Sequence, residues 1–286
     1  MLLLLPLLAV AAGLIWAQSK FSQIERVQVA QVLDAQTGEA QNILMVGSDQ
    51  GEDRVGQRSD TIMMLRLEPE RTLVMSIPRD LFVTIATTGR EQRINAAYND
   101  GPAALVQTVQ ESLDLPVHRY MEVDFVTFAS LVDAIGGVTI NFPHPVTDEK
   151  AHLAIQETGD VQLNGEQALA YVRARTYVEL IDGRQVPDGR GDLGRVERQQ
   201  NFMRVLFGKI GDSRNPFRLM RIGSSVVDGL RIDDDMSLLD SFRLALRMGD
   251  LAPESVELPT FPFTAGGADV LGLREEGAEA ALEQFR

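Results

Sequence analysis

Short apolar runs alternate with polar segments along this chain, and the first apolar run occupies the N-terminus. Met1 to Ala17 carry no charged side chain and consist mostly of Leu and Ala. A run of ~17 residues lies at the lower end of the lengths that span a bilayer. We therefore predict a membrane anchor or signal segment over 1–20, followed by an extracytoplasmic domain. The alternative, a helix buried in the core, would show an amphipathic pattern that this segment lacks.

An uncleaved anchor is favoured over a removable signal peptide. Ile15-Trp16-Ala17 is a poor cleavage site, because signal peptidases require small residues there. The next segment, 21–41, is polar and is interpreted as a linker or stalk, or as a first strand that leads into the domain. The domain proper is expected to begin near Asn42.

Three apolar runs after this point are predicted as strands. They are Asn42–Val46, Thr61–Leu67 and Thr72–Ile77, and turn-forming residues follow each of them. A hairpin returns the chain to the edge of the sheet where it began. The end of the third run is therefore expected beside the start of the second.

Two aspartates and one arginine should meet at this edge. Asp49 follows the first run, Asp60 precedes the second, and Arg79 follows the third. Neighbouring carboxylates repel each other unless a cation neutralises them, and a pair of oxygen ligands suits Mg²⁺ shared with substrate phosphates. The simpler alternative is that Asp49 and Asp60 only cap turns.

Helical periodicity appears in the following part of the chain. Residues 101–113 are predicted as one helix, and a second runs from its N-cap Asp124 to Ile135. We interpret the apolar face of the second helix as ordinary core rather than as a lipid groove. Val138–Phe142 is predicted as a strand, and His144–Asp160 as a long loop or lid.

A further helix has a well-specified start and a basic end. Asn164 and Gln167 have the spacing of a capping box. Arg173 and Arg175 follow at the other end, and residues two apart point the same way only if the chain has left helical geometry. The two arginines then form a clamp. The alternative is a solvated basic helix end, which the helix dipole favours.

Charged residues also lie on the apolar face of a last predicted helix, after a Gly-, Asp- and Arg-rich loop over 181–191. Asp192, Arg195 and Gln199 fall on or beside the apolar stripe, and Arg198 flanks it. Charged groups are stable in such positions only when they are paired. With the arginines already described they leave an excess of positive charge that suits a phosphate or pyrophosphate ligand.

Composition excludes several classes of function. The net charge of −14 and the pI near 4.7 disfavour nucleic-acid binding. The chain has no cysteine, and its three histidines, His118, His144 and His152, lack the spacing of a metal site. A bound metal ion would therefore have oxygen ligands. With 44% hydrophobic residues, the 286-residue chain can build a buried core.

Seven motifs in order carry a resemblance to a known family. They are Asn-Ile-Leu-Met-Val-Gly-Ser-Asp, Arg-Ser-Asp-Thr-Ile-Met-Met-Leu, Ser-Ile-Pro-Arg-Asp, Arg-Ile-Asn-Ala-Ala-Tyr, Leu-Val-Asp-Ala-Ile-Gly-Gly-Val, Leu-Asn-Gly-Glu-Gln-Ala-Leu-Ala-Tyr-Val-Arg-Ala-Arg and Gly-Asp-Leu-Gly-Arg-Val-Glu-Arg-Gln-Gln. The chain resembles the LytR-CpsA-Psr family, strongly over 42–210, and 42–286 would be its catalytic domain.

The resemblance implies both a fold and an activity. The implied fold is α/β, with a mixed central β-sheet flanked by helices on both faces in three layers and preceded by an N-terminal membrane segment. The implied activity is transfer of a glycopolymer from a polyprenyl-pyrophosphate carrier to peptidoglycan, on the outer face of the bacterial cytoplasmic membrane. Such a reaction depends mainly on positioning and charge stabilisation, which suits a site dominated by Arg and Asp.

The family's functional residues match positions that the pattern already singles out. Its Mg²⁺ ligands, which would also accept Mn²⁺, match Asp49 and Asp60. Asp192 matches an acidic residue that orients the arginines, and Asp60, Arg79 and Asp192 are the expected catalytic residues. The expected pyrophosphate-binding residues are Arg58, Arg79, Arg173, Arg175, Arg195, Arg198 and Gln199.

The chain departs from the family pattern at two places. Gln50 stands where the family often has a basic residue, which removes one expected phosphate contact. The spacer 176–191 is longer than usual and is interpreted as a rim loop that alters the acceptor. Two other hypotheses remain, a hydrolase that cleaves lipid pyrophosphates and a non-enzymatic membrane sensor. The C-terminal part, 213–286, shows helices but no chemistry.

Overall fold

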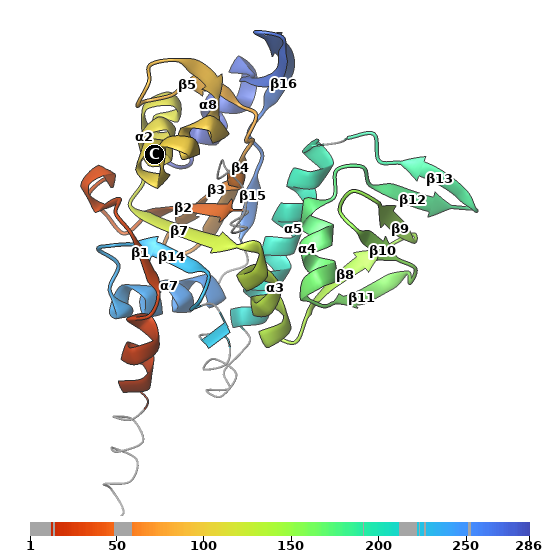
Figure 1. Ribbon diagram of the computed structural model, residues 1–286, viewed down its shortest axis with the longest axis horizontal. Helices are drawn as coiled ribbons and strands as arrows, with labels where there is room; N and C mark the ends of the chain where they lie inside the picture. The colour runs from red at the N-terminus through yellow and green to blue at the C-terminus, as the bar shows by residue number, and fades with distance from the viewer. Residues whose placement is uncertain are drawn as a thin grey trace, which may run out of the picture.

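The three predicted strands are consecutive neighbours in a seven-stranded sheet (Figure 1). The computed structural model describes residues 13, 15–48, 59–190, 192–211, 222, 224–225, 227–250 and 253–286. In sheet order the strands are β1 (Glu25–Val27), β14 (Leu230–Asp233), β7 (Arg119–Asp124), β2 (Gln41–Ser48), β3 (Ser59–Leu67), β4 (Thr72–Ile77) and β15 (Glu254–Val256).

The sheet mixes parallel and antiparallel pairs. Strands β2, β3 and β4 are antiparallel neighbours, as the hairpin argument predicts. Strand β7 runs parallel to β2, β15 runs parallel to β4, and β1 runs parallel to β14. Strand β14 is antiparallel to β7. The predicted mixed central sheet is therefore confirmed.

Helices cover both faces of this sheet, because successive strand residues point to opposite sides. Leu44 packs in one core cluster with α2 and α8, whereas its neighbour Ile43 packs in a second with α3, α4, α5 and α7. The α-helices are α2 (Pro102–Leu113), α3 (Phe125–Ala134), α4 (Gly165–Arg173), α5 (Asp192–Gly211), α7 (Leu238–Asp250) and α8 (Glu275–Glu283). Two 3-10 helices accompany them, η1 (Ala30–Val32) and η2 (Ile94–Asp100).

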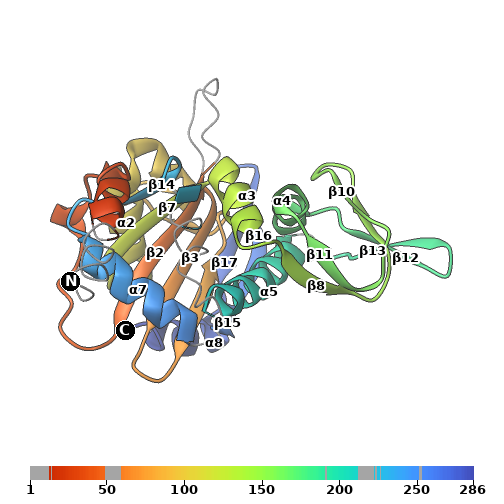
Figure 2. The same cartoon turned by 90° about the horizontal axis from the view of Figure 1, so that it is seen from below.

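A lobe of short strands extends beside α4 and α5 (Figure 2). Its strands are β8 (Val138–Phe142), β9 (Val146–Asp148), β10 (Leu153–Ile155), β11 (Gly159–Leu163), β12 (Val178–Ile181) and β13 (Arg184–Pro187). The expectation of one long loop over 144–160 is therefore wrong. Strands of three residues, such as β9 and β10, are too short to give a readable alternation.

The spacer 176–191 also differs from the expected loop. It contains β12 and β13, which pair antiparallel as a hairpin. The two turn residues Asp182 and Gly183 both have positive φ angles, 50° and 76°. Asp-Gly is the sequence that the type I′ hairpin turn favours, because both of its central residues need positive φ. This signal was present in the sequence.

Part of the segment expected as a linker is integrated into the fold. Strand β1 pairs with β14 of the central sheet, and the side chains of Phe21 and Val29 are buried. The segment 21–41 therefore supplies a first strand. The predicted anchor over 1–20 lies largely outside the described residues. Among the residues that are described, none belongs to a helix long and apolar enough to cross a bilayer.

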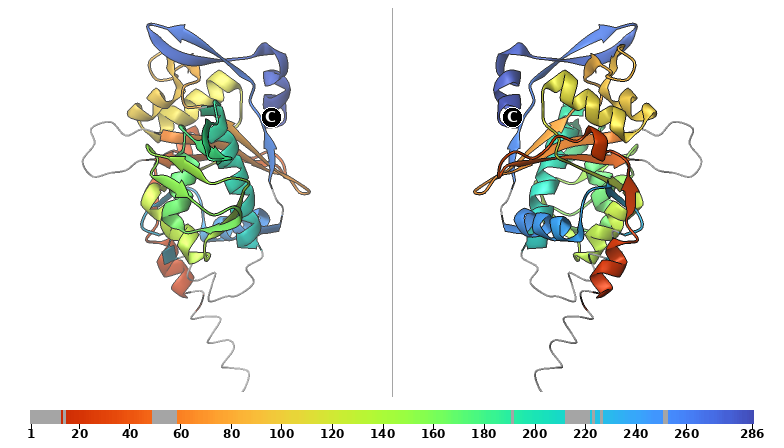
Figure 3. Two further views of the ribbon diagram at one scale, coloured as in Figure 1. Left: turned by 90° about the vertical axis from the view of Figure 1, so that its right-hand side faces the viewer. Right: turned by 90° about the vertical axis from the view of Figure 1, so that its left-hand side faces the viewer.

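The C-terminal part folds back against the segment after β4. Strands β16 (Thr260–Ala265) and β17 (Ala268–Leu273) form a hairpin beside β5 (Phe82–Thr84) and β6 (Glu91–Arg93), as Figure 3 shows. The backbone N–H of Leu271 donates to the carbonyl of Asp80 at 3.0 Å. The ring of Phe82 meets Phe263 edge-on at 5.6 Å. These contacts fix the hairpin next to Arg79.

Candidate functional site

A β-bulge places one of the two predicted acidic positions, Asp60, between two paired residues of β3. Gly47 pairs with Thr61 and Ser48 pairs with Ser59, so Asp60 is the extra residue between them. Bulges redirect the chain locally and are frequent beside active sites. Asp49 and Arg58 lie outside the described residues, and the side chain of Asp60 is not described.

A cationic cavity of about 290 Å³ lies where β3, β4, α4 and α5 meet, and we call it the arginine cavity. Four arginines and one lysine line it, against one described carboxylate. The described lining residues are Thr61, Arg79, Phe125, Asp148, Lys150, Ala151, Val172, Arg173, Arg175, Arg195 and Gln199. This excess of positive charge suits an anionic ligand.

Arg173 and Arg175 reach this cavity because α4 ends between them. Ala174 is the C-cap, and its extended backbone (φ −60°, ψ 130°) breaks the helical period. The Arg173 guanidinium stacks over the ring of Phe125 at 4.6 Å. Both arginines line the same cavity, where Arg173 is exposed and Arg175 is half-buried.

The start of α4 is fixed as firmly as its end. The Asn164 side chain accepts a hydrogen bond from the Gln167 N–H at 2.9 Å, and the Gln167 side chain accepts one from the Asn164 N–H at 3.1 Å. The predicted capping box is confirmed. A side chain at Gly165 would collide with the Ala129 backbone of α3, at 2.2 Å from its carbonyl oxygen. The glycine therefore allows the close packing that sets the position of Arg173.

Asp148 is a functional candidate that the sequence argument missed. Its carboxylate is buried and accepts five hydrogen bonds, from the backbone N–H groups of Lys150, Ala151, Arg175 and Thr176 and from the Thr176 hydroxyl. Burial raises the pKa of Asp148, but the hydrogen bonds from Thr176, Ala151 and Arg175 outweigh burial and lower it below the ordinary value. Asp148 thus holds the backbone beneath Arg175.

Arg195 and Gln199 lie one turn apart on α5 and both are buried, with 4% and 7% of their surface exposed. Gln199 Nε2 donates to the Thr61 hydroxyl at 3.1 Å and to the Val172 carbonyl at 3.2 Å. It therefore connects β3 to the end of α4. Asp192 is the first residue of α5, but its side chain lies outside the described part.

Arg198 is the one described arginine of the predicted set that does not line this cavity. It forms an ion pair with Asp188 at 2.9 Å, donates to the Ala174 carbonyl at 2.7 Å, and stacks over Tyr177 at 4.5 Å. These contacts tie the chain between α4 and β13 to α5. The arrangement suits a positioning role better than direct contact with an anion.

An apolar cavity of about 270 Å³ adjoins the arginine cavity. The two cavities share four lining residues, Thr61, Phe125, Val172 and Gln199. The other lining residues are Met45, Val46, Gly47, Met63, Met121, Val123, Phe128, Leu131, Leu169, Phe202, Met203, Leu206 and Leu230. The apolar face of α3, expected to be ordinary core, is therefore divided: Phe125, Phe128 and Leu131 line the cavity, while Val132 is buried.

A buried polar network supports the end of β2. The Glu122 carboxylate accepts hydrogen bonds from the Ser48 hydroxyl at 2.7 Å, from Tyr98 at 2.6 Å and from Tyr120 at 2.9 Å, and Arg231 pairs with it at 3.2 Å. Burial, followed by the Glu122 charge, raises the pKa of Tyr120 well above its usual value. Ser48 directly precedes Asp49, so this network fixes the backbone that leads into the predicted acidic pair.

Metal ligands cannot be assigned among the described side chains alone. Within that part of the chain, no group of three or more His, Asp or Glu side chains is arranged to hold an ion. Asp148 lines the arginine cavity, but its oxygens already accept the backbone and hydroxyl hydrogen bonds described above. The predicted ligands Asp49 and the side chain of Asp60 lie outside the described part of the chain.

This α/β protein thus joins a cationic cavity to an apolar one, two surfaces of different chemistry side by side. The chain belongs to the LytR_cpsA_psr family, whose match covers residues 14–285. It is 33% identical to the probable cell wall biosynthesis protein LcpB of Corynebacterium glutamicum, over 95% of this chain and 66% of that protein. The chain thus spans just under two thirds of that relative's length.

Two further proteins are similar over most of the chain. The polyisoprenyl-teichoic acid–peptidoglycan teichoic acid transferase TagU of Enterococcus faecalis is 30% identical, over 82% of this chain and 78% of its own. The LytR-Csp2A-Psr enzyme from Actinomyces oris has a TM-score of 0.77 at 24% identity, and the match covers 92% of this chain and 95% of that one. The second likeness establishes that the fold is shared.

Proposed function

We propose that this protein transfers a glycopolymer from a polyprenyl-pyrophosphate carrier to peptidoglycan. The observation that carries the proposal is the direct junction of the arginine cavity with the apolar cavity through Thr61, Phe125, Val172 and Gln199. A lipid pyrophosphate has the same two parts, an anionic head and an apolar chain. The name of the E. faecalis relative, a teichoic acid transferase, supports the same substrate class.

The pyrophosphate would bind in the arginine cavity. Arg79 approaches from the end of β4, Arg173 and Arg175 from the end of α4, and Arg195 from α5. Arginine presents several N–H donors in a planar fork that matches phosphate oxygens. Gln199, at the boundary between the two cavities, would mark the point where the head group ends and the prenyl chain begins.

The reaction is a phosphoryl transfer. A hydroxyl oxygen of the peptidoglycan attacks the phosphorus that carries the glycopolymer, the bridging P–O bond breaks, and polyprenyl phosphate leaves with the bond electrons. The hydroxyl proton passes to a carboxylate, for which Asp60 and Asp192 are the candidates. The arginines stabilise the charge that develops on the phosphate oxygens, which is the main contribution a protein makes to such reactions.

A divalent cation, Mg²⁺ or Mn²⁺, would be held by Asp49 and Asp60. The donor set fits, because carboxylate oxygens are the ligands that Mg²⁺ prefers. The Ser48–Ser59 pairing supports the proposal, because Asp49 directly follows Ser48 in the sequence and Asp60 directly follows Ser59. When bound, the ion would supply positive charge at the pyrophosphate. Asp148 would contribute indirectly, by holding the Arg175 backbone in place.

The proposed location is the outer face of the cytoplasmic membrane, with residues 1–20 as a single-pass anchor. The uncharged sequence Met1–Ala17 supports the anchor, and a membrane-bound carrier lipid requires an enzyme at the membrane surface. Protease added to intact cells whose wall has been removed should cut the chain beyond Lys20. Complete protection of the domain would rule this location out.

One experiment tests the proposed reaction. The purified protein is incubated with a synthetic polyprenyl-pyrophosphate glycan, peptidoglycan fragments and Mg²⁺, and the products are identified by mass spectrometry. The expected product is a glycan joined to the fragment through one phosphate, together with polyprenyl phosphate. Release of a glycan phosphate without attachment to peptidoglycan would instead identify a hydrolase, since water would have replaced the acceptor hydroxyl.

A further inference from the structure

A third cavity, of about 460 Å³, also has Arg79 in its wall, and we call it the distal groove. Its walls come from β5, β6, η2 and the β16–β17 hairpin. Arg79 lines both the distal groove and the arginine cavity, so the two are neighbours. The distal groove shares no described lining residue with the apolar cavity.

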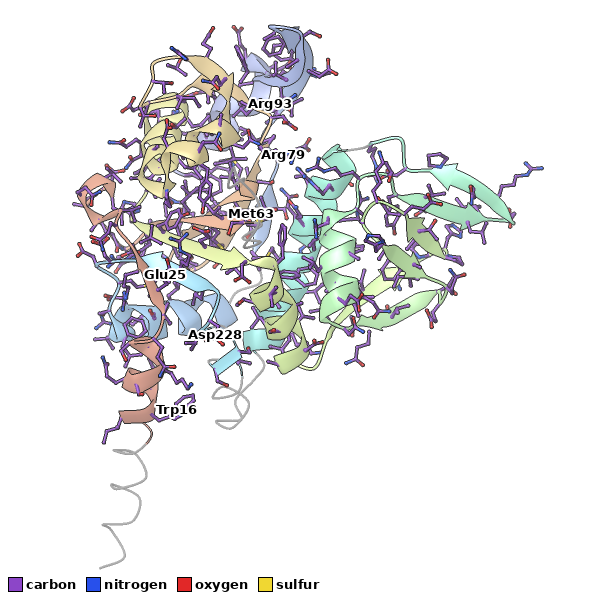
Figure 4. The ribbon with its side chains drawn as sticks, in the orientation of Figure 1. Trp16, Glu25, Met63, Arg79, Arg93 and Asp228 are labelled. Atoms are coloured by element: carbon purple, nitrogen blue, oxygen red, sulfur yellow. The ribbon has the colours of Figure 1, made fainter. Side chains whose placement is uncertain are left out.

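The three cavities thus follow one another, with the arginine cavity in the middle. In Figure 4, Arg79 lies between Met63, which lines the apolar cavity, and Arg93, which lines the distal groove. In phosphoryl transfer the attacking and leaving oxygens lie roughly in line through the phosphorus. With the prenyl chain in the apolar cavity, the leaving oxygen faces that cavity. An attacking oxygen in line with it would then arrive from the side of the distal groove.

We infer that the distal groove binds the acceptor, an uncharged sugar of the peptidoglycan strand that carries hydroxyl and acetamido groups. This inference rests on the proposed transfer reaction and adds to it the position of the acceptor. From the sequence, the spacer 176–191 was interpreted as a rim loop that alters the acceptor. The groove is built from other segments, which are far from that spacer in the chain.

The groove is lined by groups that suit such a sugar. Gln92, Asn95 and Asn99 contribute side-chain amides, and in the described part of the chain these amides make no hydrogen bond. An amide offers both donors and an acceptor, as hydroxyl and acetamido groups require. Phe82 adds apolar surface for the C–H face of a sugar ring, and its contact with Phe263 holds it in place.

The charge of the groove is balanced, unlike that of the arginine cavity. Two arginines, Arg79 and Arg93, face two acidic residues, Asp80 and Glu91. Asp80 lies between both arginines, 3.5 Å from Arg79 Nε and 3.3 Å from Arg93 Nε. Arg93 also donates to the Asp269 carbonyl at 2.6 Å, which ties the hairpin to β6. A polyanionic glycopolymer would gain little electrostatic attraction in this groove. The binding of a neutral sugar does not depend on an excess of charge.

The test uses two groove variants of the full chain, each with a matched control. The double variant Gln92→Ala/Asn99→Ala removes two exposed amides, and Ala268→Trp obstructs the groove with a bulky ring. The double variant Gln156→Ala/Gln185→Ala and the single variant Ala154→Trp make the same kinds of change at exposed positions of the strand lobe. Steady-state transfer is measured while the peptidoglycan tetrasaccharide and the lipid-linked donor are varied in turn.

Both groove variants should raise the KM for the acceptor by about fivefold or more, the effect of losing one or two hydrogen bonds to the ligand. The KM for the donor and the thermal midpoint should match those of the controls. An unchanged acceptor KM would overturn the inference. A raised donor KM with an unchanged acceptor KM would also overturn it, by assigning the groove to the donor glycan.

Direct binding separates a failure of this inference from a failure of the proposed function. The tetrasaccharide alone is titrated into the protein without donor, and binding is followed by saturation-transfer NMR. Binding that the groove variants weaken and the controls retain supports the groove even if no transfer product forms. Binding that is equal in all variants, alongside normal transfer by the wild type, rejects the groove and leaves the proposed function intact.

Discussion

The Asp148 carboxylate accepts the backbone N–H of Arg175 at 2.8 Å, and so links the strand lobe to the arginine cavity. Asp148 ends β9, whereas Arg175 follows the C-cap of α4. The same oxygen also accepts the N–H of Thr176 at 2.6 Å. The conformation that directs Arg173 and Arg175 into one cavity therefore depends on a carboxylate that belongs to a different structural element.

Replacing Asp148 by Asn should weaken this link while conserving size. The uncharged amide has one oxygen instead of two, so some of the backbone N–H groups lose their acceptor, and a buried donor without a partner costs about 1–3 kcal/mol. We expect a lower thermal midpoint and a raised KM for the lipid donor. Asp160→Asn is the control, because Asp160 is exposed and accepts a bond from the Asn141 side chain. Equal behaviour of the two variants would contradict the positioning role.

The pH dependence of stability provides a second readout of the same residue. The hydrogen bonds from Thr176, Ala151 and Arg175 exceed the effect of burial and lower the pKa of Asp148 in the folded state. A carboxyl whose pKa is lowered by folding stabilises the folded state at pH values above its pKa in the unfolded chain, about 3.9. This stabilisation is lost as the pH falls through the pKa of the folded state. The midpoint difference between wild type and Asp148→Asn should therefore shrink in acid. If the difference in thermal midpoint stayed constant down to strongly acidic pH, the ionised Asp148 carboxylate would not be the source of the stabilisation.

Arg79 and Arg195 should each be needed for turnover. Replacing either by Ala removes a cation from a cavity with one described carboxylate, so the rate should fall by about tenfold or more. Arg184→Ala, at an exposed position of β13, serves as the control. Circular dichroism and thermal melts establish that the variants are folded. Wild-type turnover in both variants would show that the anion site lies elsewhere.

The apolar cavity should set the response to the length of the prenyl chain. Leu169→Trp fills part of this cavity from α4. We expect a raised KM for donors with long prenyl chains and little change for a donor with a short chain. Leu180→Trp, on the exposed surface of β12, is the matched control. An equal effect on long and short donors would argue against a prenyl chain in this cavity.

The proposed cation makes a distinct prediction about Asp49 and Asp60. Replacing either by Asn removes one negative charge, so the Mg²⁺ concentration that supports half-maximal turnover should rise in each single variant. If both bind one ion, the double variant should show hardly any further increase, because the two changes remove the same interaction. Titration of all four proteins with Mg²⁺ gives the measurement. Unchanged Mg²⁺ dependence with slightly lower stability would leave both residues as turn caps.

The elements that the sequence predicts best are those with long, regular patterns. The apolar run Thr72–Ile77 forms β4 over the same residues, and the Asn164 capping box is present as expected. The sequence allowed Arg173 and Arg175 to be paired only if the helix ended between them, and the extended backbone of Ala174 meets this condition. Their common cavity required the fold.

Most of the features that could not be predicted from the sequence depend on contacts between residues that are distant in the chain. Asp148 lies in a segment of very short strands, and nothing in its neighbours indicates that it accepts bonds from Arg175 and Thr176. Arg198 has the helical position of a ligand-binding residue, but its partner Asp188 comes from the spacer that was expected to be a loop. The Asp182-Gly183 turn is different, because its hairpin could have been predicted from those two residues.

The β12–β13 hairpin has a consequence for self-association. Among the described strands, β13 is the last of its sheet and has a strand neighbour on one side only, and all four of its residues are exposed. Such edges can recruit the same strand of another copy and start aggregation. Here Pro187 supplies no N–H for a ladder, and Arg184 adds a charge that repels its counterpart. The hairpin can thus extend the rim of the lobe without creating a strand edge that promotes aggregation.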